Sequence, residues 1–305
     1  MIAEAIHHIT AQLPAGVRLV AVSKYHPTEA IREAFAAGQR LFGESHAQEL
    51  QLKHAELAAL ESPEGCWQPG NPGGHTSLVH QENAEGQAPA GTLGPLEWHF
   101  IGHLQTNKVK YIAPYVALIH SADSPHLLEA INRQALKVGR TIRCLLQLHV
   151  AEEETKFGFT HDEALAYLDS GAWQQLTGIQ LAGVMAMATN TDDTARIRSD
   201  FHRARQFFER AQHDYFPTSA AKAPDIATPP TIAPAAPGAA SAAPGTASAT
   251  QVCSAGDGSP VAPTHTPIFS ELSMGMSDDW HIAVDEGSTL IRIGTQIFGH
   301  RAYTA

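Results

Sequence analysis

The sequence predicts an α/β fold: one (β/α)8 barrel, also called a TIM barrel, with two low-complexity loop insertions. Three observations predict it. Short apolar runs alternate eight times with longer amphipathic runs, which is typical of parallel strands joined by helices. Two proline-rich stretches interrupt the alternation and leave 219 residues for it, close to the roughly 200 residues of the smallest barrels. The first apolar run ends in Ser23-Lys24-Tyr25-His26-Pro27 and lacks the glycine-rich turn of the competing fold, a doubly wound open sheet.

The two interrupting stretches, residues 62–96 and 217–267, hold 15 of the 19 prolines. The second stretch is rich in alanine and carries only three charged residues, Lys222, Asp225 and Asp257. The second stretch has no apolar periodicity that could offset the entropy cost of ordering it. The first stretch holds seven glycines besides its five prolines. We therefore expect both to be flexible surface loops of one domain that covers residues 1–305.

The predicted strands are short, apolar and rich in β-branched residues. They cover residues 17–24, 40–43, 97–101, 116–120, 142–150, 181–185, 268–273 and 289–293. In a barrel, the carboxyl ends of the strands and the loops that follow them form the functional face. Polar residues at these ends are therefore the candidates for a site.

The predicted helices follow the strands along the chain. They cover residues 28–37, 45–60, 125–138, 161–169, 192–212, 277–286 and 295–298. Thr28 is a candidate N-cap for the first helix, and Gly38 is a stop signal for it. Pro125 suits the first turn of its helix, where no backbone N–H is needed. The carboxylates that begin helix 161–169 suit the positive end of the helix dipole.

The composition excludes several classes of protein. A formal net charge of −11 disfavours a nucleic-acid groove, which needs clustered Lys and Arg. Cys66, Cys144 and Cys253 have no paired spacing, so we expect neither a disulfide framework nor a metal centre. The first thirty residues lack a basic start followed by an apolar core, and no run of about 18 apolar residues occurs. We therefore expect a cytoplasmic protein without a membrane partner.

Lys24 ends the first predicted strand. Apolar neighbours disfavour the charged ammonium form of a lysine, and the neutral amine is a nucleophile toward carbonyl carbons. The alternative is a lysine at a strand end that simply reaches into solvent.

Two turns at the last two strand ends suit an anion. Residues 273–278 read SMGMSD between a strand and a helix, and residues 292–295 read RIGT in the same position. Small residues let backbone N–H groups approach a phosphate, and barrels often bind phosphate at the loops after their seventh and eighth strands. A serine N-cap with a tight glycine turn would explain either turn alone. The two together indicate a ligand with a phosphate at these turns and an aldehyde at Lys24.

The histidines indicate no site. His99 and His103 are four residues apart, but they straddle a strand end and Gly102, so they do not share a helix face as a metal-binding pair would. We interpret most of the 18 histidines as surface or core residues.

Six motifs of the chain resemble the pyridoxal phosphate homeostasis proteins, the YggS/PROSC family. They are LVAVSKYHP (19–27), FGESHAQEL (42–50), EWHFIGHLQTNK (97–108), ETKFGF (154–159), LSMGMSDD (272–279) and IRIGTQIF (291–298). They spread over nearly all of the predicted barrel and skip both insertions. The resemblance implies a barrel of the alanine racemase N-terminal domain type that binds pyridoxal 5′-phosphate (PLP).

The resemblance also implies which residues contact PLP. They are Lys24 for the Schiff base, Ser273 with Gly275 and Gly294 with Thr295 for the phosphate, and Arg292 for the pyridine nitrogen. A guanidinium is permanently charged and disfavours protonation of that nitrogen, which makes the cofactor a weaker electron sink. Ser45 stands where the family usually has asparagine, so any contact of that amide is in question here.

We therefore expect a protein of intracellular PLP homeostasis that holds PLP on Lys24 and has no catalytic residues of its own. PLP-dependent apoenzymes would accept the cofactor, and the protein would act as a monomer. The alternative is a PLP-dependent enzyme such as an amino-acid racemase. Barrel racemases take a second catalytic base from a C-terminal β-domain, and this chain ends at Ala305, twelve residues after Ile293. That feature favours the carrier.

Overall fold

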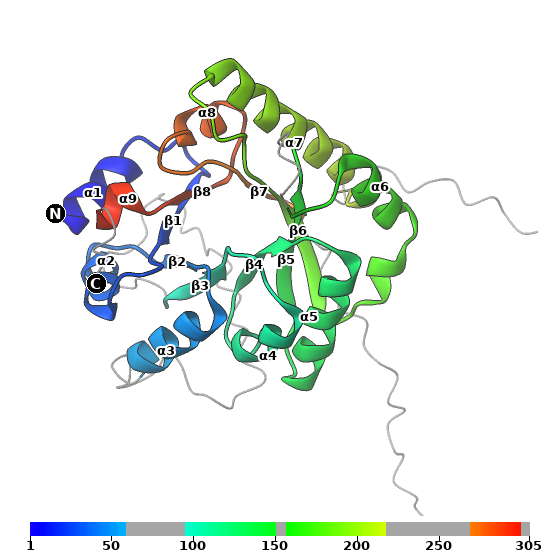
Figure 1. Ribbon diagram of the computed structural model, residues 1–305, viewed down its shortest axis with the longest axis horizontal. Coiled ribbons are helices and arrows are strands. Elements are labelled where there is room, and N and C mark those ends of the chain that lie inside the picture. Colours follow the sequence, from blue (N-terminus) through cyan, green and yellow to red (C-terminus); the bar gives the residue numbers. More distant parts are fainter. Residues whose placement is uncertain (59–94, 151–156, 218–268, 300–305) are drawn as a thin grey trace, which may run out of the picture. The chain divides into compact units, whose positions relative to one another are not determined.

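Eight parallel strands close into a barrel that is surrounded by helices (Figure 1). The structure is a computed structural model, and it describes residues 1–58, 95–150, 157–217 and 269–299. In chain order around the barrel, the strands are β1 (Arg18–Val22), β2 (Leu41–Glu44), β3 (Glu97–Phe100), β4 (Leu118–Ala122), β5 (Ile142–Leu148), β6 (Ile179–Ala186), β7 (Glu271–Ser273) and β8 (Leu290–Ile293). The pairing of β8 with β1 closes the barrel, with Arg18 opposite Leu290 and Ala21 opposite Ile293. The predicted fold class is confirmed.

Helices connect the strands on the outside of the barrel. They are α1 (Ile2–Thr10), α2 (Thr28–Ala36), α3 (Ala47–Ala58), α4 (Val109–Ile112), α5 (Pro125–Lys137), α6 (His161–Asp169), α7 (Thr194–Tyr215), α8 (Trp280–Asp285) and α9 (Thr295–Phe298), with 3-10 turns at Thr106–Lys108 and Ala172–Gln175. Helices α1 and α4 have no counterpart among the predicted helices. Helix α1 precedes the first strand and lies beside α9, so it buries Ile6 and Ile9 on the barrel (Figure 1).

Local signals explain several helix ends. Ser124 caps α5 through its side chain, and Pro125 occupies the first turn as predicted. The prediction for α2 is wrong, because Pro27 holds the N-cap position and Thr28 is the first helical residue. The Thr28 hydroxyl donates instead to Glu56 of α3 (2.9 Å), which ties the two helices together.

Helix α8 is shorter than the predicted helix 277–286. Asp279 is its N-cap, so neither serine of the SMGMSD segment caps it. The Asp279 Oδ1 accepts a hydrogen bond from the backbone N–H of Met276 (2.6 Å) and shapes the preceding loop. The loop after β7 is therefore about one turn longer than the pattern predicted, which leaves Ser277 in the loop and outside the helix.

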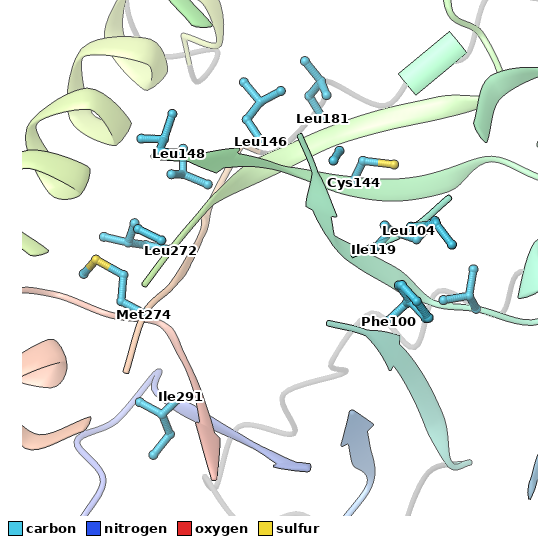
Figure 2. Packing of buried hydrophobic residues seen from close by; sticks show 14 of the residues in the cluster. Phe100, Leu104, Ile119, Cys144, Leu146, Leu148, Leu181, Leu272, Met274 and Ile291 are labelled. Carbon is cyan, nitrogen blue, oxygen red and sulfur yellow. The ribbon is translucent and has the colours of Figure 1, made fainter. Parts of the chain in front are cut away.

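The core has two layers because side chains of a strand alternate between its two faces. One layer fills the barrel; its members are Val20, Leu41, Leu118, Leu145, Ala182, Met185 and Leu290. The other lies between the strands and the helices. Figure 2 shows Ile119, Leu146 and Ile291 of this second layer on the outer side of their strands. Because this alternation repeats every two residues, a residue two positions before or after a first-layer residue on the same strand also points into the barrel.

Charged side chains close the amino-terminal end of the barrel interior. Glu271 is buried, and its Oε1 accepts from Arg18 Nη2 (2.5 Å) and from Arg143 Nη2 (2.7 Å). Burial alone would raise the pKa of Glu271, but the two guanidinium groups outweigh it and lower the pKa below its ordinary value. The carboxyl ends of the strands form the opposite end of the barrel, which we call its mouth.

The two predicted insertions lie almost entirely outside the described residues, so their assignment as flexible loops of one domain stays a prediction. Among the helices of the described ranges, none is both long enough and apolar enough to cross a lipid bilayer.

Candidate functional site

Lys24 lies in a tight turn directly after β1. The backbone N–H of Ser23 still pairs with the Gly43 carbonyl of β2 (3.0 Å), and the N–H of His26 returns to the Ser23 carbonyl (3.1 Å). Lys24, which is half-buried, and Tyr25 form the corner between them. Tyr25 has a φ of 66°, a left-handed conformation that a bulky residue keeps only when its surroundings hold it.

Two side chains of α3 hold this turn. The Lys53 ammonium donates to the Ser23 carbonyl (2.7 Å), to Glu44 Oε1 (2.8 Å) and to Glu49 Oε1 (2.7 Å). Glu49 Oε1 also accepts from the backbone N–H of Tyr25 (2.6 Å), so a carboxylate fixes the strained residue. Lys53 is 6% exposed and has three N–H donors, all of them used here. It is therefore a structural lysine that positions the neighbouring turn.

Glu44 lies fully buried behind the turn, at the end of β2. Its Oε1 accepts from the Ser23 hydroxyl (2.7 Å) as well as from Lys53. Burial raises the pKa of Glu44 above its ordinary value, and attraction to Lys53 offsets only part of that rise. Glu44 and Lys53 thus form a polar wall between β1, β2 and α3 that fixes the backbone on one side of Lys24.

Hydrogen bonds join the loops after β7 and β8. The backbone N–H of Arg292 donates to the Gly275 carbonyl (3.0 Å). At the mouth of the barrel, the Thr295 hydroxyl donates to Ser277 Oγ (2.9 Å), and Gln296 Nε2 donates to the Ser277 carbonyl (2.6 Å). Thr295 is exposed and Ser277 half-buried. The two predicted turns are therefore hydrogen-bonded to each other, and the hydroxyls of Ser277 and Thr295 form a pair between them.

Ser273 lies deeper than the other predicted phosphate residues. It is the last residue of β7 and fully buried, and its Oγ accepts from Arg292 Nη1 (2.5 Å). Arg292 Nη1 also donates to the Ser273 carbonyl (2.9 Å), and Nη2 donates to the Ala186 carbonyl at the end of β6 (3.1 Å). Burial lowers the pKa of Arg292 to about 10, so the guanidinium stays charged at neutral pH. The Ser273 hydroxyl is thus committed to Arg292, whereas Ser277 offers its hydroxyl at the mouth.

The three candidate segments lie on neighbouring strands, β7, β8 and β1. Gly294 lies so close to β1 that a Cβ there would be 3.2 Å from the Val22 carbonyl oxygen. The His26 ring in the turn after β1 stacks on Phe298 of α9, with ring centroids 5.1 Å apart. The structure therefore brings the Lys24 turn beside the turn that opens α9.

The donor set of this corner suits an elongated ligand with an anion at one end and a carbonyl carbon at the other. Hydroxyl and backbone N–H groups favour a phosphate, an amine attacks a carbonyl, and a fixed cation suits the ring nitrogen of a heterocycle. All three kinds of group occur on three adjacent strands here, on one side of the mouth of the barrel.

Residues 2–240 match the sequence model of the family described as "Alanine racemase, N-terminal domain". The chain belongs to this family. Within the alanine racemase N-terminal domain family, it is similar to the pyridoxal phosphate homeostasis proteins of Aquifex aeolicus and Pseudomonas aeruginosa. The first is 27% identical over 286 residues, 94% of this chain and 88% of the relative. The second is 29% identical over 292 residues, 96% of this chain and 88% of the relative. The resemblance predicted from the six motifs is confirmed.

Solved structures similar to this chain agree with the fold. PipY of Synechococcus elongatus, solved with PLP bound, is 30% identical and has a TM-score of 0.65, covering 98% of this chain and all of PipY. An alanine racemase of Clostridium difficile is 10% identical with a TM-score of 0.57, and the match covers this chain and 57% of the racemase. The racemase therefore shares the barrel fold.

Replacing Gly275 with alanine is expected to lower the free energy of unfolding. Gly275 has a φ of +91°, and a Cβ there would be 2.7 Å from the Ala283 Cβ and 2.9 Å from the Trp280 Cα. Backbone strain and overpacking together should cost about 2–4 kcal/mol. Urea denaturation measures this loss. Gly16→Ala is the matched control, because Gly16 has a φ of +89° with nothing within 4 Å of a Cβ. Equal losses in the two variants would contradict the packing role of Gly275.

Sequence reasoning missed several residues that shape this corner. Ser277 belongs to the SMGMSD segment, but the segment alone does not reveal which of its serines reaches the mouth. Glu44 directly follows a short predicted strand, whereas Glu49 and Lys53 lie on α3, where Lys53 resembles an ordinary exposed lysine. The spacing of Glu49 and Lys53, four residues apart on one helix, was the available signal for an ion pair.

Proposed function

We propose that this protein binds PLP, forms a Schiff base between Lys24 and the PLP aldehyde, and serves PLP homeostasis in the cell. The observation that carries the proposal is the adjacency of the Lys24 turn to the joined turns after β7 and β8. The relatives named pyridoxal phosphate homeostasis proteins and the PLP-bound PipY support it. Lys53, which lies buried behind the Lys24 turn, has all three donors engaged and cannot take the role of Lys24.

Each residue of the corner has a separate task in this proposal. Gly294, Thr295 and Ser277 would hold the phosphate through backbone N–H groups and hydroxyls, and Gly275 would keep the loop after β7 in place. Arg292 would face the pyridine nitrogen, with its charge fixed between β6 and β7. When bound, PLP supplies an electrophilic aldehyde and an electron sink, and a guanidinium at its ring nitrogen makes that sink weaker.

Visible absorption of the purified full-length protein tests the proposal. Addition of PLP should produce the band of a lysine-bound PLP, and borohydride should abolish the band and leave a stable adduct. Digestion and mass spectrometry then locate the adduct. A protein that keeps free PLP in solution, with no band and no adduct, would refute the proposal.

Racemisation of alanine or serine by the PLP-loaded protein is expected to stay near the rate of free PLP. The weakened electron sink at Arg292 gives little stabilisation to negative charge at a substrate carbon. Chiral chromatography of the amino acid, at several protein concentrations, measures the rate. Saturable turnover well above free PLP would instead support the alternative, an amino-acid racemase.

PLP held on Lys24 would have to leave the protein to reach an acceptor. We infer that PLP-dependent apoenzymes accept PLP from this protein, which acts as a monomer in the cytoplasm. Light scattering after size exclusion tests the monomer. Reconstitution of an apoenzyme from the loaded protein, in the presence of a trap for free PLP, tests direct transfer.

A further inference from the structure

A buried chain of hydrogen bonds leads from Arg292 across the inside of the barrel. Arg292 Nη1 donates to Ser273 Oγ (2.5 Å), Ser273 Oγ lies 2.9 Å from His120 Nδ1, and His120 Nε2 lies 2.9 Å from His99 Nδ1. All four side chains are buried, with at most 5% exposure. His120 is on β4 and Ser273 on β7, which are not neighbours in the sheet (Figure 1), so this bond crosses the interior.

The two imidazoles in this chain of hydrogen bonds, His99 and His120, are neutral. Burial lowers the pKa of His99 to about 3, and the charges of Arg18 and Arg143 contribute to the shift. Burial lowers the pKa of His120 well below its ordinary value, with further contributions from His99 and from the nearby guanidinium groups. A neutral imidazole has one N–H donor and one bare nitrogen acceptor. Each ring can therefore accept at one end and donate at the other.

Only one arrangement of protons satisfies the whole chain. A guanidinium can only donate, so Ser273 Oγ accepts from Arg292. The Ser273 hydroxyl proton then needs an acceptor, and among the described residues His120 Nδ1 is the one within hydrogen-bond distance. His120 must carry its proton on Nε2 and donate it to His99 Nδ1, which leaves the His99 proton on Nε2. Every bond of the chain thus points away from Arg292.

We propose that His120 and His99 are positioning residues for Arg292: through Ser273 they hold its guanidinium in the orientation in which it meets the ring nitrogen of a pyridine ligand. This inference rests on the proposed function. It assigns the Ser273 hydroxyl to Arg292 and leaves the phosphate to the hydroxyls of Ser277 and Thr295. Because the chain ties β3 and β4 to β7 and β8, it also couples the two sides of the barrel below the site.

The proton positions are testable without PLP. In the full-length protein labelled with ¹⁵N, NMR should find His120 and His99 both as Nε2–H tautomers, with a scalar coupling between His120 Nε2 and His99 Nδ1. Neither ring should titrate between pH 7 and pH 5. A proton on His120 Nδ1, or a missing coupling, would show that the proposed arrangement of hydrogen bonds is wrong, whatever ligand the protein binds.

The link to the ligand is tested with PLP-loaded variants. Ser273→Ala should shift the absorption maximum and weaken PLP binding about tenfold, the effect of one lost hydrogen bond to a charged group. His120→Leu, which removes the acceptor of the Ser273 hydroxyl proton, should change both in the same direction. His120→Asn should retain most of the wild-type spectrum, because Asn Oδ1 can replace the Nδ1 acceptor for Ser273. Ser121→Ala is the matched control: it removes a fully buried hydroxyl beside His120 that donates to the Gly102 carbonyl and does not touch Arg292.

The following results would contradict the positioning role of His120 and His99. A wild-type spectrum and affinity in Ser273→Ala would overturn the positioning role. If Ser273→Ala and Ser121→Ala changed the spectrum and the PLP affinity equally, the effect would come from a general loss of stability. That result would also overturn the positioning role. If the wild-type protein forms no Lys24 adduct, the proposed function fails, and with it the positioning of Arg292 for PLP. The histidine tautomers would still test the proposed arrangement of hydrogen bonds. Where a variant does not fold, the tautomers of the wild-type protein remain the deciding measurement.

Discussion

Replacing Lys24 with alanine is expected to abolish the covalent attachment of PLP to this protein. The turn that holds Lys24 is fixed by Lys53 and Glu49, and Lys53 has no donor left for another partner. An alanine has no amine, so borohydride treatment should leave no adduct on the protein. Absorption spectra before and after borohydride, with mass spectrometry of the digest, measure the loss.

A second variant separates charge from nucleophilicity at this position. Lys24→Arg keeps a positive charge, but a guanidinium does not act as a free amine. It should retain PLP as a weak, dissociable ligand and also show no adduct. Lys110→Ala, which removes an exposed lysine on α4, is the control and should keep the full adduct. An adduct of wild-type intensity in Lys24→Ala would mean that another lysine carries the aldehyde.

Acidification from pH 7 to pH 5 is expected to destabilise the protein through His99 and His120. Their pKa values in the folded state, about 3 for His99 and well below the ordinary value for His120, lie below the ordinary value of 6.5. Between these values the unfolded chain binds protons that the folded protein excludes, so stability falls as the pH falls. For His99 the cost from pH 7 to pH 5 is about 2 kcal/mol. His120 adds a cost of the same sign.

Several charged groups around these histidines also contribute to the pH dependence of stability. Arg18, Arg143 and Arg292 disfavour a further positive charge, while Glu271 favours one on His99. Glu44 has a raised pKa and contributes in the opposite sense, so the total slope mixes several groups.

The difference between wild type and His99→Gln isolates one imidazole. Urea denaturation at pH 7 and pH 5 should show a stability loss about 2 kcal/mol smaller in the variant. His126→Gln, which removes an exposed imidazole on α5, is the control and should keep the wild-type slope. An unchanged slope in His99→Gln would show that His99 titrates alike in the folded and unfolded protein.

Much of the fold could be predicted because strand and helix periodicity is a local property. The eight strands lie within a few residues of their predicted positions, and helix 161–169 matches α6 in full. Thr160 and Glu163 form a capping box at its start, a signal written in four consecutive residues. One error occurs where a distant contact competes with a local signal. Thr28 donates to Glu56 of another helix instead of capping its own.

The candidate site was predicted less completely than the fold. The turn that carries Lys24 and the turn that opens α9 are neighbours, as their places after β1 and β8 indicated. That Lys24, Gly294 and Thr295 hold one ligand stays a prediction. Ser273 and Ser277 look equivalent in the sequence, yet one faces the barrel interior and the other the mouth. The difference depends on where β7 ends and where α8 begins, and the short, mixed pattern of this segment does not specify either.

The sequence by itself determined the alternation of strands and helices, the barrel, the family and the strand-end lysine, because each is recorded in neighbouring residues. Only the tertiary structure decided which polar side chains meet inside the barrel. His120 and Ser273 are separated by 153 positions, and their hydrogen bond exists because closure of eight strands brings β4 and β7 to face each other. Two histidines that the pattern assigned to the core or the surface thereby acquire neutral rings and fixed protons. The physical reason is that burial and pairing depend on the arrangement of the whole chain, whereas periodicity depends on a few adjacent residues.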